Sequence, residues 1–536
     1  MKEKIEEIIN LKGKFQYITC FVIIMTATLT TVYTLEISYL SKQPNFIDPL
    51  NPNITIKYSH NLCKDIESNK LIKDIKNSLN NWSYSFNIYC SNDIYIDLIP
   101  TLVFAGALLG CLFLTQFPDR IGREKMLKIM MSFSLFVMFL QFINSNILET
   151  LLINLLGGID TFTFSMSFYV VTEYLPRDWT GFSMGLLNGL YSLLGILLGF
   201  FFMFINKWRI IFTVLLILHI ITTYLIFAYF TESPNYLINI GNGNHALECY
   251  KKIARINGRE KEINEYIEKN NKEIQDFFKE SFQISSSKKL NFKTYSVIEI
   301  FQLKSQRKNF LILSYIWFAG SFNYFGIIIN LKTIPGNFFS NSIMAFLGEL
   351  ISELTAGYIS DIYGRLIIMK ICSYFGSISF LISLFLNGFL KSTFIMIGML
   401  GIAGCYTVSS VYTPEIFAPK LRGTVCGFLC LLMRVGPLCV PTLTNFLGIG
   451  VYFLMVISEL FVGILVNFLE ETLNRKIVDS IPEENERNDK ESFLGNYYNG
   501  ISSFKSGDYF NKEKNEKIEV IESCYLSGNF NSFVYK

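Results

Sequence analysis

One charged side chain interrupts a strongly apolar stretch of the chain, "LLMRVGPLCVP" at residues 431–441. The surrounding run, from Gly423 to about Gly448, is long enough to cross a bilayer. A guanidinium at that depth costs roughly 2.5–3.5 kcal/mol on insertion scales. Its planar, permanently charged fork binds carboxylate, sulfate or phosphate through two parallel hydrogen bonds. We therefore predict that Arg434 recognises an anionic group inside a polar cavity.

Four carboxylates are expected at a similar depth: Asp160 in "LLGGIDTFTF", Glu459 in "VISELFVG", and Glu349 with Glu353 in "LGELISEL". Glu349 and Glu353 are four residues apart and share one helical face. Two purely structural roles for Arg434 stay open, an ion pair with Glu459 or one with Asp160. If Arg434 and Asp160 both face a cavity, a zwitterionic ligand becomes attractive.

Aromatic side chains in the predicted span near 309–331 add a second kind of contact. Trp317, Tyr324 and Phe325 offer ring faces for cation–π or stacking interactions, although each alone fits packing equally well. The predicted substrate-binding set is Arg434, Asp160, Glu349, Trp317, Tyr324 and Phe325.

The elements that position these residues are membrane helices. The chain has 536 residues, of which 51% are hydrophobic and only 17% charged, against about 25% charged in soluble proteins. Apolar runs of spanning length fall near 15–40, 95–117, 126–145, 148–175, 182–205, 208–230, 309–331, 341–360, 366–388, 392–414, 423–448 and 450–469. We expect an all-α membrane protein with twelve transmembrane helices in two six-helix bundles, 15–230 and 309–469.

Lysine and arginine gather in alternate loops, which places the N-terminus 1–14, the central loop 231–308 and the tail 470–536 in the cytosol. The loop 41–94 is then external. Two glycosylation sequons begin there at Asn53 and Asn81. We also expect a disulfide between Cys63 and Cys90, which would stabilise the loop by about 3–4 kcal/mol in the chain-entropy model.

Matched motifs occur at matched places in the two halves. "FPDRIGREK" in the first corresponds to "GYISDIYGR" in the second, and "TEYLPRDWTG" corresponds to "YTPEIFAPKLRG". Such a pattern indicates an internal duplication. We expect Arg123 to pair with Glu173, and Arg365 with Glu415, in ion pairs at the inner mouth that form in one conformational state and break in another.

These motifs resemble the major facilitator superfamily. "TESPNYLINIGNGNHALECYKKIARING", "YIWFAGSFNYFGIIINL" and "NFLEETLNR" are similar to segments of its organic cation, anion and carnitine transporter family, and the resemblance covers about 30 to 475. It implies two pseudo-symmetric bundles that work by alternating access. The implied gating residues are Asp119, Arg120, Gly122, Arg123, Glu173, Glu232, Asp361, Gly364, Arg365, Glu415 and Arg422.

The arginine context "RVGPLCVP" resembles the version found in organic-anion and carnitine carriers of that family. We therefore expect a secondary-active or facilitative transporter of small organic anions or zwitterions. One alternative is an organic cation transporter that uses Asp160 and Glu349. Departures from the family pattern at Thr115, Thr180 and Ile362 keep open a third, a non-transporting structural subunit.

Several function classes are excluded or left without support. No G-x-x-x-x-G-K-[ST] motif occurs, and the scattered cysteines and three histidines form no metal-binding pattern, so we expect no enzyme, no cofactor and no metal. The net charge of +3 gives no sign of nucleic-acid binding. The expected partners are a small organic ion and the lipid bilayer, with a coupling ion left open, and the expected location is the plasma membrane.

Overall fold

A computed structural model describes residues 2–473 apart from 10–11, 59–61, 69, 91–93, 176, 271, 278, 280–296, 333, 335, 418 and 449. Most of the predicted tail 470–536 and part of the predicted central loop 231–308 therefore lie outside the described residues. The account below concerns the compact unit that ends before residue 479.

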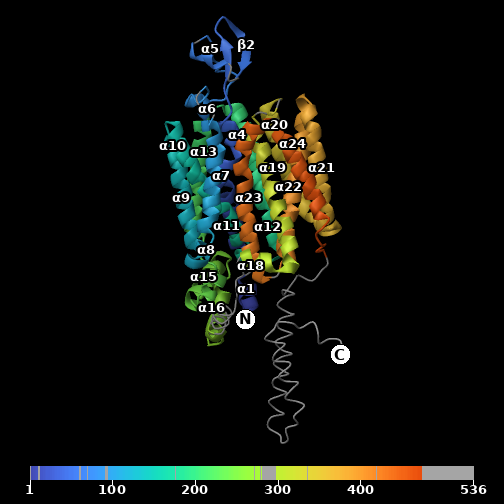
Figure 1. Cartoon of the computed structure of the whole chain (residues 1–536). Coiled ribbons are helices and arrows are strands. Elements are labelled where there is room, and N and C mark those ends of the chain that lie inside the picture. Colours follow the sequence, from blue (N-terminus) through green and yellow to red (C-terminus); the bar gives the residue numbers. More distant parts are fainter. Residues whose placement is uncertain are drawn as a thin grey trace, which may run out of the picture. The chain divides into compact units, whose positions relative to one another are not determined.

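Long helices run side by side through the molecule, as Figure 1 shows. In the described chain ten helices are long and apolar enough to span a bilayer, and two shorter apolar helices, Lys14–Thr30 and Gly450–Val466, begin and end the series. Spans one to six are α2–α4 (Lys14–Thr30, Val32–Leu35, Ile37–Leu40), α7 (Ile94–Leu114), α9 (Arg123–Ile143), α10–α11 (Ile147–Asp160, Phe162–Tyr174), α12 (Arg177–Ile205) and α13 (Trp208–Tyr229). Spans seven to twelve are α19 (Lys304–Asn330), α20 (Phe338–Tyr363), α21 (Arg365–Phe385), α22 (Gly388–Ile416), α23 (Pro419–Leu447) and α24 (Gly450–Val466).

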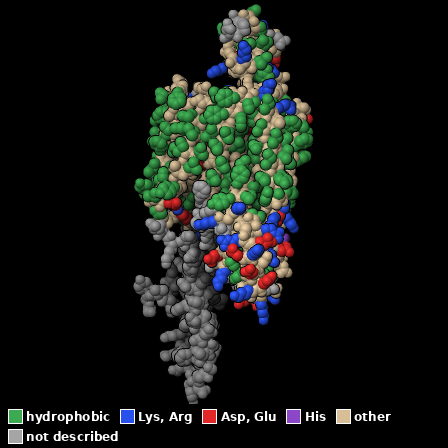
Figure 2. Space-filling model, turned by 180° about the vertical axis from the view of Figure 1, so that it is seen from behind, with side chains coloured by type: hydrophobic (Ala, Val, Ile, Leu, Met, Phe, Trp, Pro, Cys, Tyr) green, Lys and Arg blue, Asp and Glu red, His purple; other side chains and the backbone are tan. Residues whose placement is uncertain are grey.

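The surface of this helical body is apolar where lipid would cover it. Figure 2 shows a broad hydrophobic belt, with lysine, arginine, aspartate and glutamate gathered mainly on the helices beyond one end. Those helices are α14 (Pro234–Asn239), α15 (Gly243–Ile256) and α16 (Glu260–Lys269), with α1 (Lys2–Ile8), α8 (Phe117–Ile121) and α18 (Val297–Gln302) nearby. The α15 helix is amphipathic, since its buried residues recur at helical spacing, from Ala246 through Cys249 and Tyr250 to Ile253.

Span one is not a continuous helix. It breaks at Thr31 and again at Glu36 into the three short helices α2, α3 and α4. The hydroxyls of its threonines donate to backbone carbonyls three or four residues earlier, as Thr30 does to Thr26 at 3.1 Å and Thr34 to Thr31 at 2.7 Å. Such back-bonding competes with the helical ladder and bends helices. The sequence "TATLTTVYT" therefore explains the interruption.

Small residues let the first-half helices approach closely. A Cβ on Gly158 in α10 would lie 2.0 Å from the carbonyl oxygen of Val103 in α7. Close backbone contact of this kind drives helix association in membranes, where burial of apolar surface adds little. This packing fixes span four, which carries Asp160 and Thr161, against span two.

The loop 41–94, which is predicted to be external, forms a small lobe at the opposite end from α15 and α16 (Figure 1). Strands β1 (Asn45–Asp48), β2 (Asn51–Lys57) and β3 (Ile72–Lys73) form an antiparallel sheet in the order β2-β1-β3, in which Phe46 pairs with Ile56 and Lys73. Two short helices, α5 (Cys63–Glu67) and α6 (Trp82–Ser85), complete the lobe, and a disulfide joins Cys63 to Cys90.

The structure contradicts the predicted glycosylation at Asn81. Its side chain is fully buried, and the amide Nδ2 donates to the carbonyl oxygens of Tyr39 at 2.7 Å and Lys42 at 2.8 Å. The same side chain caps α6 by accepting from the amide of Tyr84. A glycan needs this nitrogen free, so Asn81 is a structural residue. The side chain of Asn53 lies outside the described residues.

Candidate functional site

A cavity lies between the two halves, with walls from spans one, four and five on one side and spans seven, eight, ten and eleven on the other. It contains about 730 Å³ of empty space, a figure that includes open solvent. The lining residues are Thr31, Thr34, Thr161, Phe164, Asn188, Tyr191, Gly320, Ser321, Tyr324, Phe325, Glu349, Glu353, Ile402, Ala403, Tyr406, Met433 and Arg434. Four of the six residues predicted to bind substrate line it, namely Arg434, Glu349, Tyr324 and Phe325.

Arg434 is buried in the cavity wall with most of its hydrogen-bonding capacity unused. Its only recorded bond in the described chain is from Nη2 to the hydroxyl of Ser165 at 3.5 Å, and its Nε has no partner. No carboxylate of a described residue lies within ion-pair distance of it. A guanidinium presents five donors, and burying them unpaired is costly. A negatively charged ligand group would remove that cost.

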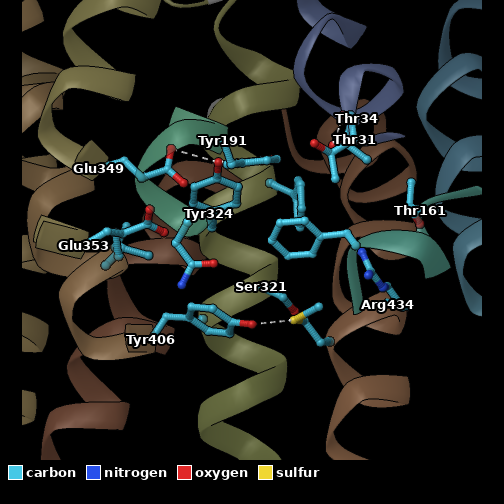
Figure 3. A pocket seen from close by; sticks show the side chains of 17 residues that line it. Thr31, Thr34, Thr161, Tyr191, Ser321, Tyr324, Glu349, Glu353, Tyr406 and Arg434 are labelled. Carbon is cyan, nitrogen blue, oxygen red and sulfur yellow. Dashed lines mark hydrogen bonds between the residues drawn. The ribbon is translucent and has the colours of Figure 1, made fainter. Parts of the chain in front are cut away.

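Two carboxylates lie on the opposite wall. Figure 3 shows Glu349 and Glu353 on one side of the cavity and Arg434 on the other. Glu349 accepts a hydrogen bond from the hydroxyl of Tyr324 at 3.0 Å, and Glu353 accepts one from Ser192 at 3.2 Å. Both carboxylates come from α20, one helical turn apart, as the sequence spacing predicts.

The structure departs from the prediction at Asp160 and Trp317, which do not line the cavity. Asp160 is fully buried inside the first bundle, where it accepts hydrogen bonds from Ser134 at 2.6 Å and Thr163 at 3.4 Å. Trp317 donates from Nε1 to Thr413 at 3.2 Å. Depth in the membrane indicated that Asp160 is buried, but it does not determine which side of a helix faces the cavity.

Neither structural partner proposed for Arg434 is in contact with it. Glu459 instead accepts a hydrogen bond from Nδ2 of Asn323 at 2.6 Å, and Asp160 has the two hydroxyl donors described above. Each of these carboxylates therefore has neutral partners of its own.

The inner end of the first bundle contains the predicted ion pair. Arg123 contacts Glu173 and Asp119, with Nη2 at 2.8 Å from each carboxylate. Glu232 accepts the backbone amides of Arg123 at 2.8 Å and Glu124 at 3.2 Å, at the first turn of α9. Burial raises the pKa of Glu232, while hydrogen bonds from the amides of Ser233, Glu124 and Arg123 act in the opposite direction.

The second bundle repeats this arrangement. Arg365 donates from Nη2 to Glu415 at 3.1 Å and from Nη1 to Asp361. Glu471 accepts the backbone amides of Arg365 and Leu366, each at 3.0 Å. Burial would raise the pKa of Glu471, but the backbone N–H groups that point at its carboxylate outweigh burial and hold that pKa below its usual value.

Glu471 is the functional residue that sequence reasoning missed. It follows the last span of the second half, as Glu232 follows the last span of the first half. The signal was present, because "NFLEETLNR" occupies the position in the second half that "TESPN" occupies in the first.

Two predicted gating arginines differ from expectation. Arg422 donates from Nε to the carbonyl of Phe417 at 2.9 Å and does not reach Glu415 in the described structure. Arg120 donates from Nη2 to the side-chain oxygen of Gln116 at 2.9 Å. The ion pair with Glu173 is formed by Arg123. Among the described residues a single arginine in each half forms the ion pair, Arg123 in the first and Arg365 in the second. We call each of these arginines, together with the carboxylates around it, a latch.

Twelve spans, a cavity shared between two halves and a duplicated inner latch define a membrane transporter of the major facilitator class. The family model for "Sugar (and other) transporter" matches residues 19–335. The chain belongs to that family. It is an integral, multi-pass membrane transporter that moves small organic substrates, and it is not an enzyme.

Characterised relatives are similar along most of their length. The human organic cation/carnitine transporter 2 is 23% identical over 449 residues, which cover 78% of this chain and 76% of that protein. Organic cation transporter 1 of Caenorhabditis elegans is 22% identical, over 74% and 68% of the two chains. Solute carrier family 22 member 6 of Pseudopleuronectes americanus is 22% identical, over 76% and 74% of the two chains.

A solved structure shows the same fold. The xylose transporter XylE from E. coli, in its inward-open conformation, superposes with a TM-score of 0.60 and 14% sequence identity. The match covers 86% of this chain and 97% of that one.

Proposed function

We propose that this transporter carries small organic anions or zwitterions by alternating access. The bundles 15–230 and 309–469 rock about the cavity between them, and substrate binding near the midplane shifts the equilibrium between outward-open and inward-open states. We place the N-terminus 1–14, the central loop 231–308 and the tail 470–536 in the cytosol, and the loop 41–94 outside the cell. One observation carries the charge preference: Arg434 is buried in the cavity wall without a carboxylate partner among the described residues.

The opposite wall favours a substrate that also has a positive group. Glu349 and Glu353 supply negative charge there, and the ring of Tyr324 lies between them and Arg434 (Figure 3). Phe325 adds a second ring to the cavity lining. A quaternary ammonium or similar cation is attracted both by carboxylates and by aromatic faces. A molecule with a carboxylate at one end and a cationic group at the other would satisfy both walls.

A second candidate is an organic cation carrier. It is favoured by two carboxylates on one cavity wall, and by relatives that are named as organic cation transporters. In that case the cation site consists of Glu349 and Glu353, since Asp160 lies away from the cavity. Arg434 would then repel substrate, and its replacement would raise cation uptake.

The energy source and the membrane are part of the same proposal. Transport runs on a gradient, by uniport, exchange or ion coupling. We place the protein in the plasma membrane, because its external lobe holds a disulfide and such bonds persist in oxidising surroundings.

Uptake by the purified protein in liposomes tests these alternatives. Removing one member of a buried charge pair costs about 2–5 kcal/mol, so Arg434→Ala should lower uptake of the preferred anion or zwitterion by about 30-fold or more. The matched control is Arg255→Ala, which removes an arginine that pairs with Glu260 on the surface of α15. Normal uptake by Arg434→Ala would refute anion recognition, and increased cation uptake would favour the second candidate.

A further inference from the structure

A second group of polar side chains lies inside the first bundle, outside the cavity lining. Glu36 is only 1% exposed, and neither of its carboxylate oxygens has a hydrogen-bond partner in the described structure. The hydroxyl of Tyr33 and both amide atoms of Gln141 and Asn154 are also buried without partners. Buried polar groups are nearly always satisfied, so four unsatisfied side chains in one bundle require an explanation.

Spans one and four bring three of these groups together. The ring of Tyr33 packs directly on Gly157, where a Cβ would meet it at 2.7 Å. The hydroxyl of Tyr33 is also within electrostatic range of Glu36 and Asp160. Spans one and four run antiparallel, so Glu36, three residues beyond Tyr33, lies opposite Asn154, three residues before Gly157.

Span three contributes Gln141 at the same level. The hydrogen bond between Ser134 and Asp160 sets the register of α9 against α10. Gln141 lies seven residues beyond Ser134, on the same helical face, and Asn154 lies six residues before Asp160. In this antiparallel pair the two amides therefore lie at a similar depth.

The backbone is also interrupted at this point. Helix α3 ends at Leu35 and α4 begins at Ile37, so Glu36 occupies the break itself. Ion sites in secondary transporters are commonly built at such discontinuous helices.

We propose that Glu36, Tyr33, Gln141 and Asn154 form a binding site for a small, hard monovalent cation such as Na⁺. The carboxylate supplies the charge, and the hydroxyl and amide oxygens supply neutral ligands of the kind that hard cations prefer. The neighbouring Asp160 already accepts hydrogen bonds from two hydroxyls, so Glu36 is the one carboxylate that we assign to the site. Its single negative charge suits a monovalent cation. A proton on Glu36 would neutralise it but would leave both amides unsatisfied.

The site adjoins the substrate cavity through the same helices. Thr34 lies between Tyr33 and Glu36 in the chain and lines the cavity, and Thr161, which also lines it, follows Asp160. Occupation of the site would order these two segments of the cavity wall. The coupling to transport rests on the proposed function, whereas cation binding itself does not.

Binding of radioactive Na⁺ to the purified full-length protein in detergent tests the site without any organic substrate. We expect saturable binding by the wild type and binding about 10–100-fold weaker in Glu36→Gln, which removes the only charged ligand. Glu459→Gln is the matched control, since it neutralises a buried carboxylate of the second bundle that bonds to Asn323. Its Na⁺ binding should equal that of the wild type.

Asn154→Ala is a second variant of the site, to be used if Glu36→Gln fails to fold. It should also weaken Na⁺ binding. The proposal is overturned if the wild type binds no Na⁺ saturably or if both variants bind it normally. The proposal is also overturned if the part of the thermal stability that requires Glu36 changes with pH but not with the Na⁺ concentration. In that case a proton, not Na⁺, would occupy the site. Na⁺ binding in a protein without organic-ion uptake would refute the proposed function and leave the site standing.

Discussion

Glu471 accepts a hydrogen bond from the backbone amide of Arg365 at 3.0 Å, at the first turn of α21. In the first half Glu232 accepts the amide of Arg123 at 2.8 Å at the first turn of α9. The first amides of a helix lack partners within the helix and carry the positive end of its dipole, so a carboxylate there satisfies both. Each carboxylate follows the last span of its own bundle. The contact therefore joins the start of α9 or α21 to the segment after the last span of the same bundle.

Removing this carboxylate should destabilise the second bundle. We expect Glu471→Ala to lower the free energy of unfolding by about 1–2 kcal/mol, as the loss of a helix cap does. Thermal unfolding in detergent measures the effect, and Glu232→Ala should give a loss of the same order. Glu268→Ala, at an exposed position on α16, is the control and should change little. An equal loss in the control would show that Glu471 has no special role.

The glycine before each latch arginine should resist substitution. Gly364 has a φ of +106°, and a Cβ there would lie 2.9 Å from a carboxylate oxygen of Glu471. Gly364→Ala therefore combines an unfavourable backbone conformation with a clash, and we expect a loss of about 1–3 kcal/mol in stability. The control is Gly357→Ala in helix α20, which ends one residue before Gly364; an added Cβ at Gly357 meets no atom within 4 Å. Thermal unfolding of the two variants should separate them, and similar melting temperatures would contradict this explanation.

The fold followed closely from the sequence, because a bilayer permits few alternatives. Apolar length alone located the twelve spans, and the repeated motifs identified the halves. The sequence patterns did not predict the interruption of span one, which we expected to be a single apolar run over 15–40. The break at Thr31 and Glu36 arises from threonine hydroxyls that compete for backbone carbonyls, a local effect that hydropathy does not record.

The site was predicted in part, and the errors share one cause. Arg434 and Glu349 line the cavity, whereas Asp160 does not, although its neighbour Thr161 does. Adjacent residues of a helix point about 100° apart, so depth identifies a buried charge without identifying the wall that it faces. Glu353 was visible as a neighbour of Glu349 on one face, but its place in the cavity required the packing of α20 against its neighbours.

Glycosylation offers a direct test of the external lobe. When the protein is produced in eukaryotic cells, Ser83→Ala removes the second sequon and should leave the protein's mass unchanged apart from the substitution. Asn81→Gln should also leave any glycan unchanged, yet destabilise the protein by about 1–3 kcal/mol, because it disturbs two buried hydrogen bonds. Peptide mass spectrometry checks both statements, with Asn53→Gln expected to remove a glycan if one is present. A glycan on Asn81 would show that the buried position is wrong.

The outer end of the cavity is closed by contacts between the halves. Lys332, just after α19, donates from Nζ to the hydroxyl of Ser41 at 2.9 Å, while Tyr39 and Ser342 share a hydrogen bond. Burial lowers the pKa of Lys332 from 10.5 to about 8, although the charge of Asp97 acts in the opposite direction. In an outward-open state this lysine would meet water and regain its ordinary pKa. The closed state therefore binds fewer protons, and it gains stability as the pH rises through 8.

Alkaline pH should accordingly favour the outward-closed state. Raising the pH from about 7 to about 9 should shift the equilibrium toward closure by about tenfold, since Lys332 loses its proton in the closed state only. Spin labels at Leu148 and Phe389, exposed positions in the first and second half, report the distribution between the two states. Lys332→Met should abolish the pH response, whereas Lys207→Met, an exposed lysine on the same side, should keep it. A response that persists in Lys332→Met would assign the titration to another group.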